Sequence, residues 1–130
     1  MYERLEIVII FPIKPITFGY KSILKTYWLE GRMPSVTHDF YGNELTKDTV
    51  TLEHIQPHSK GGLTKLSNLA LSKNTSNFKR SNKPLTSVFN KEAFEQYCEQ
   101  FKNIKLPGFD GNIYINSITR TVNNLLRQGK

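Results

Sequence analysis

The central part of the chain most constrains the fold, because short apolar stretches alternate there with turn-forming residues. Residues 49–53 are mostly β-branched or apolar and predict a strand, and residues 69–71 form a second short apolar stretch. Between them, residues 56–68 contain Pro, Ser, Gly-Gly and Asn, the composition of an irregular loop. Ser72 is suited to cap a helix that Pro84 would end. This part of the chain therefore predicts a strand, a loop, a second strand and a helix.

Further elements are expected on both sides of this central part. Residues 5–11 are apolar and β-branched, which predicts a buried strand, and an apolar face at helical spacing predicts a helix that Gly31 ends. Asn90 is suited to cap a third helix, and a last helix is expected over residues 116–127, after a break at Asp110-Gly111. The expected fold is one small α+β domain over residues 1–130, with an N-terminal strand and helix within 5–31 and C-terminal helices within 90–127.

Basic residues are concentrated in the centre of the chain. The sequence has 18 Lys and Arg against 11 Asp and Glu, a formal net charge of +7. Seven basic residues lie between His54 and Lys91, with Lys91 included, and no acidic residue interrupts them. A polyanion is the natural partner for such a segment, because each neutralised phosphate releases counterions, and a solvated surface is the alternative. Only Phe78 and Phe89 are aromatic there, too few for a platform that stacks single-stranded bases.

Several polar residues in the same segment have a distinctive spacing. In chain order they are Glu53 and His54 at the end of the first predicted strand, Pro57 and Gly61-Gly62 in the loop, Asn68 fourteen residues after His54, and Asn77 nine residues after Asn68. Over about residues 49–85 this pattern resembles the HNH endonuclease family. The resemblance implies a ββα-metal core, here over about residues 49–83, that hydrolyses DNA.

The resemblance also implies a role for each of these residues. Phosphodiester hydrolysis needs an activated water molecule and stabilisation of charge on the phosphate and on the departing oxygen. His54 is implied as the general base, and Asn68 as the residue that ties the loop and orients that base. Glu53 and Asn77 are implied as ligands of one Mg²⁺ or Mn²⁺ ion. The family more often has Asp at the position of Glu53, and the longer side chain changes its reach.

A structural zinc ion is not expected in this chain. Many members of the family hold one with two Cys-x-x-Cys pairs, whereas this chain has one cysteine, Cys98. The matching places carry His38 with Tyr41 and Lys73 with Ser76. The flanking helices are therefore expected to make the core rigid, with Cys98 as a small apolar residue in one of them.

The segment contains further candidate residues. His58 lies in the loop, where a second metal ligand, a phosphate contact and plain exposure to solvent stay open. Asn74 precedes Asn77 by three residues and is a lesser candidate for a ligand. Gly61 and Gly62 are expected to serve the geometry of the loop. The candidate contacts to DNA phosphates are Lys60, Lys73, Lys79, Arg80 and Lys83.

These observations predict a divalent-metal-dependent DNA endonuclease, with a DNA-binding module of little or no catalytic activity as the alternative. The expected partner is DNA, double-stranded and bound with low sequence specificity or under the guidance of another molecule. No apolar run is long enough to cross a bilayer and no signal peptide is recognised, so a cytoplasmic protein is expected. The oligomeric state is not predicted.

Overall fold

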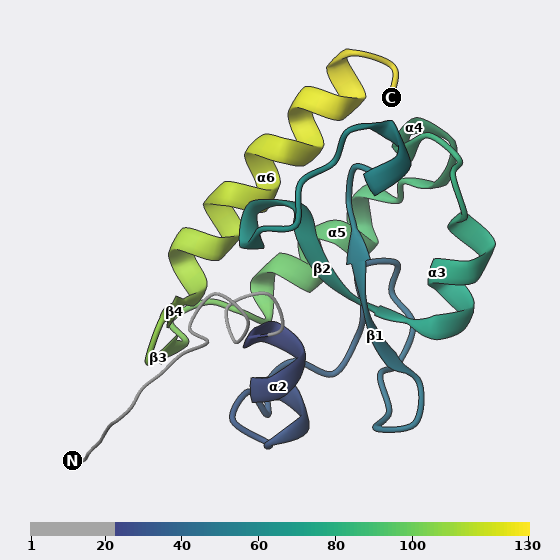
Figure 1. Ribbon diagram of the computed structural model, residues 1–130. Helices are drawn as coiled ribbons and strands as arrows, with labels where there is room; N and C mark the ends of the chain where they lie inside the picture. The colour runs from purple at the N-terminus through teal and green to yellow at the C-terminus, as the bar shows by residue number, and fades with distance from the viewer. Residues whose placement is uncertain (1–22) are drawn as a thin grey trace, which may run out of the picture.

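The computed structural model describes residues 23–130 (Figure 1). The strand predicted within residues 5–11 and the start of the first predicted helix lie outside this range. The first described helix, α2, spans Ile23–Leu29. It ends shortly before Gly31, whose φ of 76° lies in the left-handed region that favours glycine. The predicted α+β class is confirmed, since helices surround two small antiparallel sheets.

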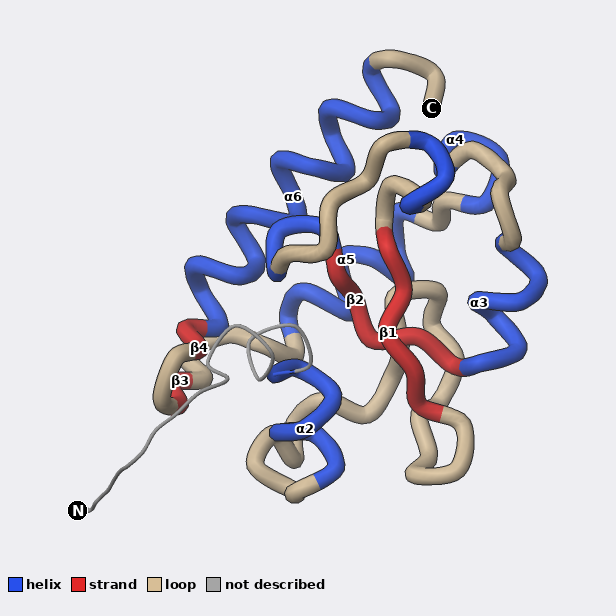
Figure 2. Tube along the Cα trace, in the orientation of Figure 1, coloured by secondary structure: helices blue, strands red, loops and turns tan. Residues whose placement is uncertain are grey.

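The predicted strand, loop, strand and helix form a continuous unit (Figure 2). Strands β1 (Val50–His54) and β2 (Leu69–Lys73) pair antiparallel, and the register runs unbroken from Val50 opposite Lys73 to His54 opposite Leu69. The long loop between them is irregular, as predicted, and contains two short 3₁₀ helices, His58–Lys60 and Leu66–Asn68. Helix α3 (Asn74–Arg80) follows β2 directly and lies beside β1.

The predicted start and end of this helix are wrong. Ser72 lies within β2 opposite Thr51, so it does not cap the helix, and its hydroxyl donates to the carbonyl of Lys73. Strand pairing therefore continues to Lys73, and α3 begins only at Asn74. The helix ends at Arg80, before Pro84. Pro84, with a φ of −63°, instead precedes a further short helix, α4 (Leu85–Val88).

The C-terminal part contains the expected helices, one of them longer than predicted. Helix α5 (Lys91–Glu99) is capped as predicted, since the Asn90 side chain accepts a hydrogen bond from the amide of Ala93 at 2.8 Å. Two short strands follow, β3 (Lys105–Leu106) and β4 (Phe109–Asp110), and they lead into α6 (Gly111–Arg127). The prediction that Asp110-Gly111 breaks the chain is wrong, because Asp110 caps α6 by accepting from the amide of Ile113.

Side chains from the C-terminal helices hydrogen-bond to the free edge of β2. Tyr114 of α6 donates to the carbonyl of Leu69 at 2.7 Å, and Tyr97 of α5 accepts from the amide of Leu71 at 2.9 Å. The two tyrosine hydroxyls also contact each other. A two-stranded sheet is marginally stable alone, so this buried edge depends on α5 and α6, of which α6 lies on the β2 side of the sheet (Figure 1). The arrangement leaves the β1 side for α3.

Two further findings concern the described part of the chain. Between residues 23 and 130, no helix has both the length and the apolar character needed to cross a membrane.

Cys98 packs against the core of buried apolar residues, as predicted, and burial raises the pKa of its thiol to about 11. That thiol is protonated at neutral pH and is a poor nucleophile.

Candidate functional site

Asn68 closes the loop that follows β1. Its side-chain oxygen accepts from the amide of Gln56 at 2.8 Å, and its side-chain nitrogen donates to the carbonyls of Gln56 and Leu63 at 3.1 and 2.9 Å. The residue is only 6% exposed. Because its side-chain oxygen accepts and its side-chain nitrogen donates, this buried asparagine fixes the backbone of a residue twelve positions earlier in the chain. Asn68 therefore occupies a loop-tying position of the kind that the sequence predicts.

The two loop glycines serve loop geometry, as predicted. Gly61 has a φ of 90°, in the left-handed region. Gly62 allows a close approach, because a Cβ built on it would lie 1.8 Å from the carbonyl oxygen of Gln56 and 2.9 Å from the side-chain nitrogen of Asn68. The three hydrogen bonds of Asn68 therefore require glycine at position 62.

His54 is half-buried at the end of β1, and its ring is held by the same loop. Its Nε2 atom lies 2.8 Å from the hydroxyl of Thr64, and the ring of His58 lies 6.0 Å away between centroids. Partial burial, and to a lesser extent the charge of His58, lower the pKa of His54. A lowered pKa keeps the imidazole neutral at pH 7, the form that accepts a proton. His58 itself is exposed.

Asn77 projects from α3 to the free edge of β1. The amide of Ile55 donates to the backbone carbonyl of Asn68, and the amide of Asn74 donates to the backbone carbonyl of Thr49. The odd-numbered residues of β1 therefore direct their backbone N–H and C=O groups toward β2. The carbonyl of Leu52 therefore points to the opposite edge, where the side-chain nitrogen of Asn77 donates to it at 3.3 Å. The side chain of Asn74 is exposed at the start of α3.

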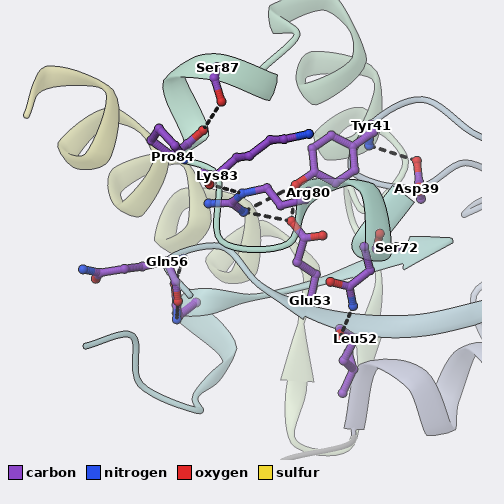
Figure 3. Close-up of polar contacts among 12 residues, drawn as sticks. Asp39, Tyr41, Leu52, Glu53, Gln56, Ser72, Arg80, Lys83, Pro84 and Ser87 are labelled. Carbon is purple, nitrogen blue, oxygen red and sulfur yellow. Dashed lines mark hydrogen bonds and ion pairs between the residues drawn. The ribbon is translucent and has the colours of Figure 1, made fainter. Parts of the chain in front are cut away.

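Glu53 lies in a buried polar cluster with Tyr41 and Arg80 (Figure 3). Glu53 and Arg80 are each 2% exposed, and Nη1 of Arg80 lies 3.1 Å from Oε2 of Glu53. The Tyr41 hydroxyl donates to the same oxygen. Burial raises the pKa of Glu53, while the hydrogen bond from Tyr41 and the charge of Arg80 act in the opposite direction. The prediction that Arg80 contacts DNA phosphates is not supported by this placement, because its guanidinium is buried against Glu53.

Glu53 and His54 face opposite sides of β1, as adjacent residues of an unbulged strand must. Glu53 extends toward Tyr41 and Arg80, and His54 toward Thr64. The Oε1 atom of Glu53 is buried and has no hydrogen-bond partner among the described residues. This free carboxylate oxygen and the amide oxygen of Asn77 are hard donors of the kind that Mg²⁺ prefers. Within residues 23–130, no group of three or more His, Cys, Asp and Glu side chains is gathered in a way suited to a metal.

Direct hydrogen bonds join residues 38–43 to residues 73–76, which include the positions His38, Tyr41, Lys73 and Ser76 considered above for a zinc site. The carboxylate of Asp39, which is fully buried, accepts from the amides of Tyr41 and Asn43 and, at 2.8 Å, from that of Lys73. The side chain of Asn43 donates to the hydroxyl of Ser76 at 2.6 Å. The sequence prediction attributed rigidity to the flanking helices and missed this contribution from Asp39. A single Asp in a polar stretch gives no signal of such distant partners.

The lysines of the segment differ in exposure. Lys60, Lys79 and Lys83 are exposed, and Lys73 is half-buried. None of these four forms an ion pair with an acid within the described range, whereas Lys91, Lys102 and Lys105 each do. Lys83 also reaches back to the carbonyl of Lys79 at 3.0 Å. Lys60, Lys79 and Lys83 therefore carry uncompensated charge that is accessible to a polyanion.

Comparisons with protein-family models, with curated proteins and with solved structures gave no match. The chemistry of the site accordingly rests on its own geometry. That geometry combines a half-buried neutral imidazole, a loop fixed beside it, a carboxamide at the strand edge and exposed lysines. Such a set is able to accept a proton and to hold an anionic substrate.

Proposed function

We propose that this chain is a divalent-metal-dependent DNA endonuclease of the HNH type, with a ββα-metal core formed by β1, the following loop, β2 and α3. Its substrate is DNA, double-stranded and bound with low sequence specificity or with guidance from a partner. The proposal includes a cytoplasmic location. A cytoplasmic nuclease would meet DNA without crossing a membrane.

One observation carries the proposal: three side chains at the predicted positions converge on a stretch of five residues. The stretch is residues 52–56, with His54 at its centre. The side chain of Asn68 forms two hydrogen bonds with the backbone of Gln56 at one end, and the side chain of Asn77 donates to the carbonyl of Leu52 at the other. The loop and the helix that carry the two asparagines therefore both return to the strand that carries the histidine.

The residues divide the work of hydrolysis between them. His54 accepts a proton from the attacking water, whose oxygen forms a bond to phosphorus while the bond to the 3′ oxygen breaks. The 3′ oxygen takes up a proton from solvent, which leaves 5′-phosphate and 3′-hydroxyl ends. Asn68 and Thr64 hold the imidazole and its loop in place. Asn77 and the Oε1 atom of Glu53 would hold the cation, whose charge stabilises the phosphate and the departing oxygen.

The second candidate function is a DNA-binding module with little catalysis. The buried ion pair between Glu53 and Arg80 favours it, because the guanidinium already neutralises the carboxylate that a cation would need. Under this hypothesis, the lysines bind DNA while the site lacks a tightly held metal. The two functions differ in cleavage and not in binding.

Plasmid nicking distinguishes the two functions. We expect the purified chain to relax supercoiled DNA with Mg²⁺ or Mn²⁺, and not after chelation with EDTA. His54→Ala should lower the rate by a factor of about 10² to 10⁴ and leave the affinity for DNA nearly unchanged. His38→Ala is the matched control, because His38 is exposed and bonds only near its own loop and Gln100. DNA that is bound but never cut would support the second function, and full activity in the His54 variant would refute the assignment of the base.

The salt dependence of binding tests the role of the lysines. Replacing Lys60, Lys79 and Lys83 together with Gln should weaken binding to unrelated sequences equally and reduce the slope of log K against log salt by about 2.7, which is about 0.9 for each phosphate contact. The control variant replaces three lysines that pair with acids, Lys91, Lys102 and Lys105. An equal change of slope in both variants would show that no particular lysines hold the DNA.

A further inference from the structure

Phe78 is the most exposed large apolar side chain in the described part of the chain. Four such residues are more than a third exposed there, at 37% for Leu29, 60% for Leu63, 86% for Phe78 and 65% for Ile113. A single exposed apolar residue is common in proteins and needs no explanation by itself. The position of Phe78 is what distinguishes it, because it directly follows Asn77 on α3 and directly precedes Lys79.

The geometry of α3 turns the ring of Phe78 outward beside the candidate site. Asn77 and Arg80 define the inner face of the helix, since both contact residues of β1. Successive residues of an α-helix are about 100° apart, so Phe78 lies one such step from Asn77 and away from the face that packs. Asn74, four residues earlier, shares its side of the helix and is also exposed. The ring therefore stands in solvent next to a residue that we assign to the metal site.

The charge around Phe78 favours nucleic acid as its partner. No acidic residue lies between His54 and Lys91, and the exposed Lys79 and Lys83 are close to Phe78 in sequence. An apolar protein surface is a poor match for this setting, because such interfaces have cores that are depleted in charged residues. A nucleic acid offers phosphates to the lysines and the flat face of a base to the ring.

We infer that Phe78 is a substrate-contacting residue that packs its ring against a nucleobase next to the phosphate to be cut. The inference rests on the proposed function, in which the substrate is DNA, and it adds a contact to the bases. One ring is not the platform of several aromatic residues that the sequence argues against. Phe78 instead supplies a single stacking contact, either at a base step of the duplex or on an unpaired base.

Binding measured in EDTA tests this contact without cleavage. The full chain is titrated into fluorescently labelled duplex, gapped duplex and single-stranded DNA of the same sequence. Phe78→Ala should weaken binding about 5- to 150-fold, the range for loss of one base–aromatic stack, with the salt slope unchanged. Phe78→Tyr should retain the affinity. Ile113→Ala is the matched control, because it removes an exposed apolar side chain from α6, outside the basic segment.

Each outcome of this experiment decides the inference. A loss on all three DNAs indicates stacking at a base step, and a loss confined to the gapped and single-stranded DNAs indicates an unpaired base. Equal affinities of wild type and Phe78→Ala on every DNA, or no binding by the wild type, would overturn the inference. If the chain binds DNA through Phe78 but never cuts it, the proposed nuclease activity is refuted and the stacking contact stands. If the chain cuts DNA and Phe78→Ala binds as tightly as wild type, only the stacking contact is refuted.

Discussion

Replacement of Arg80 by Met tests the buried ion pair that distinguishes this site. Met keeps a long, flexible side chain and removes the guanidinium that lies 3.1 Å from Glu53. Both residues are 2% exposed, so water cannot take over the role of the lost charge. The carboxylate of Glu53 would keep only the hydrogen bond from Tyr41. Arg80 also donates from Nε to the carbonyl of Lys83 at 2.7 Å, and that bond is lost as well.

The expected cost follows from the burial of the remaining charge. Removal of one partner of a buried pair costs about 3 to 5 kcal/mol, because an uncompensated charge stays in the interior. An unfolding entropy of about 2.1 cal/mol/K per residue amounts to about 0.27 kcal/mol/K for this chain of 130 residues. The melting temperature of Arg80→Met should therefore fall by roughly 10 to 20 °C.

Urea and thermal unfolding measure this cost, with an exposed pair as the control. Lys102 and Glu99 are also 3.1 Å apart, but their side chains are 60% and 68% exposed, so Lys102→Met should cost less than about 1 kcal/mol. The double variant of Arg80→Met with Glu53→Gln should lose less than the sum of the two single variants. An Arg80→Met variant no less stable than Lys102→Met would refute the assignment of Arg80 as a buried partner.

The pH dependence of this loss has a definite sign. Without Arg80, burial raises the pKa of Glu53 further, because one of the interactions that lower it is gone. The folded variant then binds a proton at pH values where the unfolded chain does not, so protonation favours the folded state. The deficit relative to wild type should be largest above the raised pKa and should shrink as the pH falls through it. A deficit that grows on acidification would contradict this reasoning.

Three further predictions concern the loop and α3. Gly62→Ala should destabilise the fold by several kcal/mol and lower cleavage, because the added Cβ would lie 1.8 Å from the carbonyl oxygen of Gln56. Gly61→Ala should cost only about 1 to 2 kcal/mol, for its positive φ, and chemical denaturation compares the two variants. His58→Gln removes a charge that lowers the pKa of His54, so that pKa should rise and the acidic limb of the cleavage profile should move to higher pH, as NMR titration of His54 would show independently. Asn77→Ala should weaken binding of Mn²⁺ in calorimetry while the protein stays folded, and unchanged binding would exclude Asn77 as a ligand.

Local sequence signals predicted the elements of the core because those signals act over a few residues. The β-branched run before His54 and the Pro and Gly residues of the loop determine where strand and loop form, and Asn90 caps its helix through an amide three residues away. The sequence does not distinguish a turn from a helix start at Asp110-Gly111, because the same dipeptide is typical of both. Only the packing of α6 on the core distinguishes the two.

The buried cluster of Glu53 was beyond sequence reasoning because its partners are distant in the chain. Tyr41 precedes Glu53 by twelve residues and Arg80 follows it by twenty-seven, and neither separation is a local pattern. A basic residue in a lysine-rich run is ordinarily exposed, so the sequence alone predicts Arg80 as a phosphate contact. The correction requires the three-dimensional proximity of α3 to β1. The same proximity places Asn77 at the edge of β1, where its side chain donates to the carbonyl of Leu52.

Polar contacts with residues outside α3 explain how this seven-residue helix is positioned beside β1. A helix this short is not stable by itself in water, so its position must come from tertiary contacts. The carboxylate of Asp39 accepts from the amide of Lys73, just before the helix. The side chain of Asn43 donates to Ser76 in the first turn, and Glu53 forms an ion pair with Arg80 at the end. Asn77 lies between Ser76 and Arg80 on the helix. Through its ion pair with Arg80, Glu53 thus contributes to the placement of α3 and, with it, to the position of Asn77 at the edge of β1.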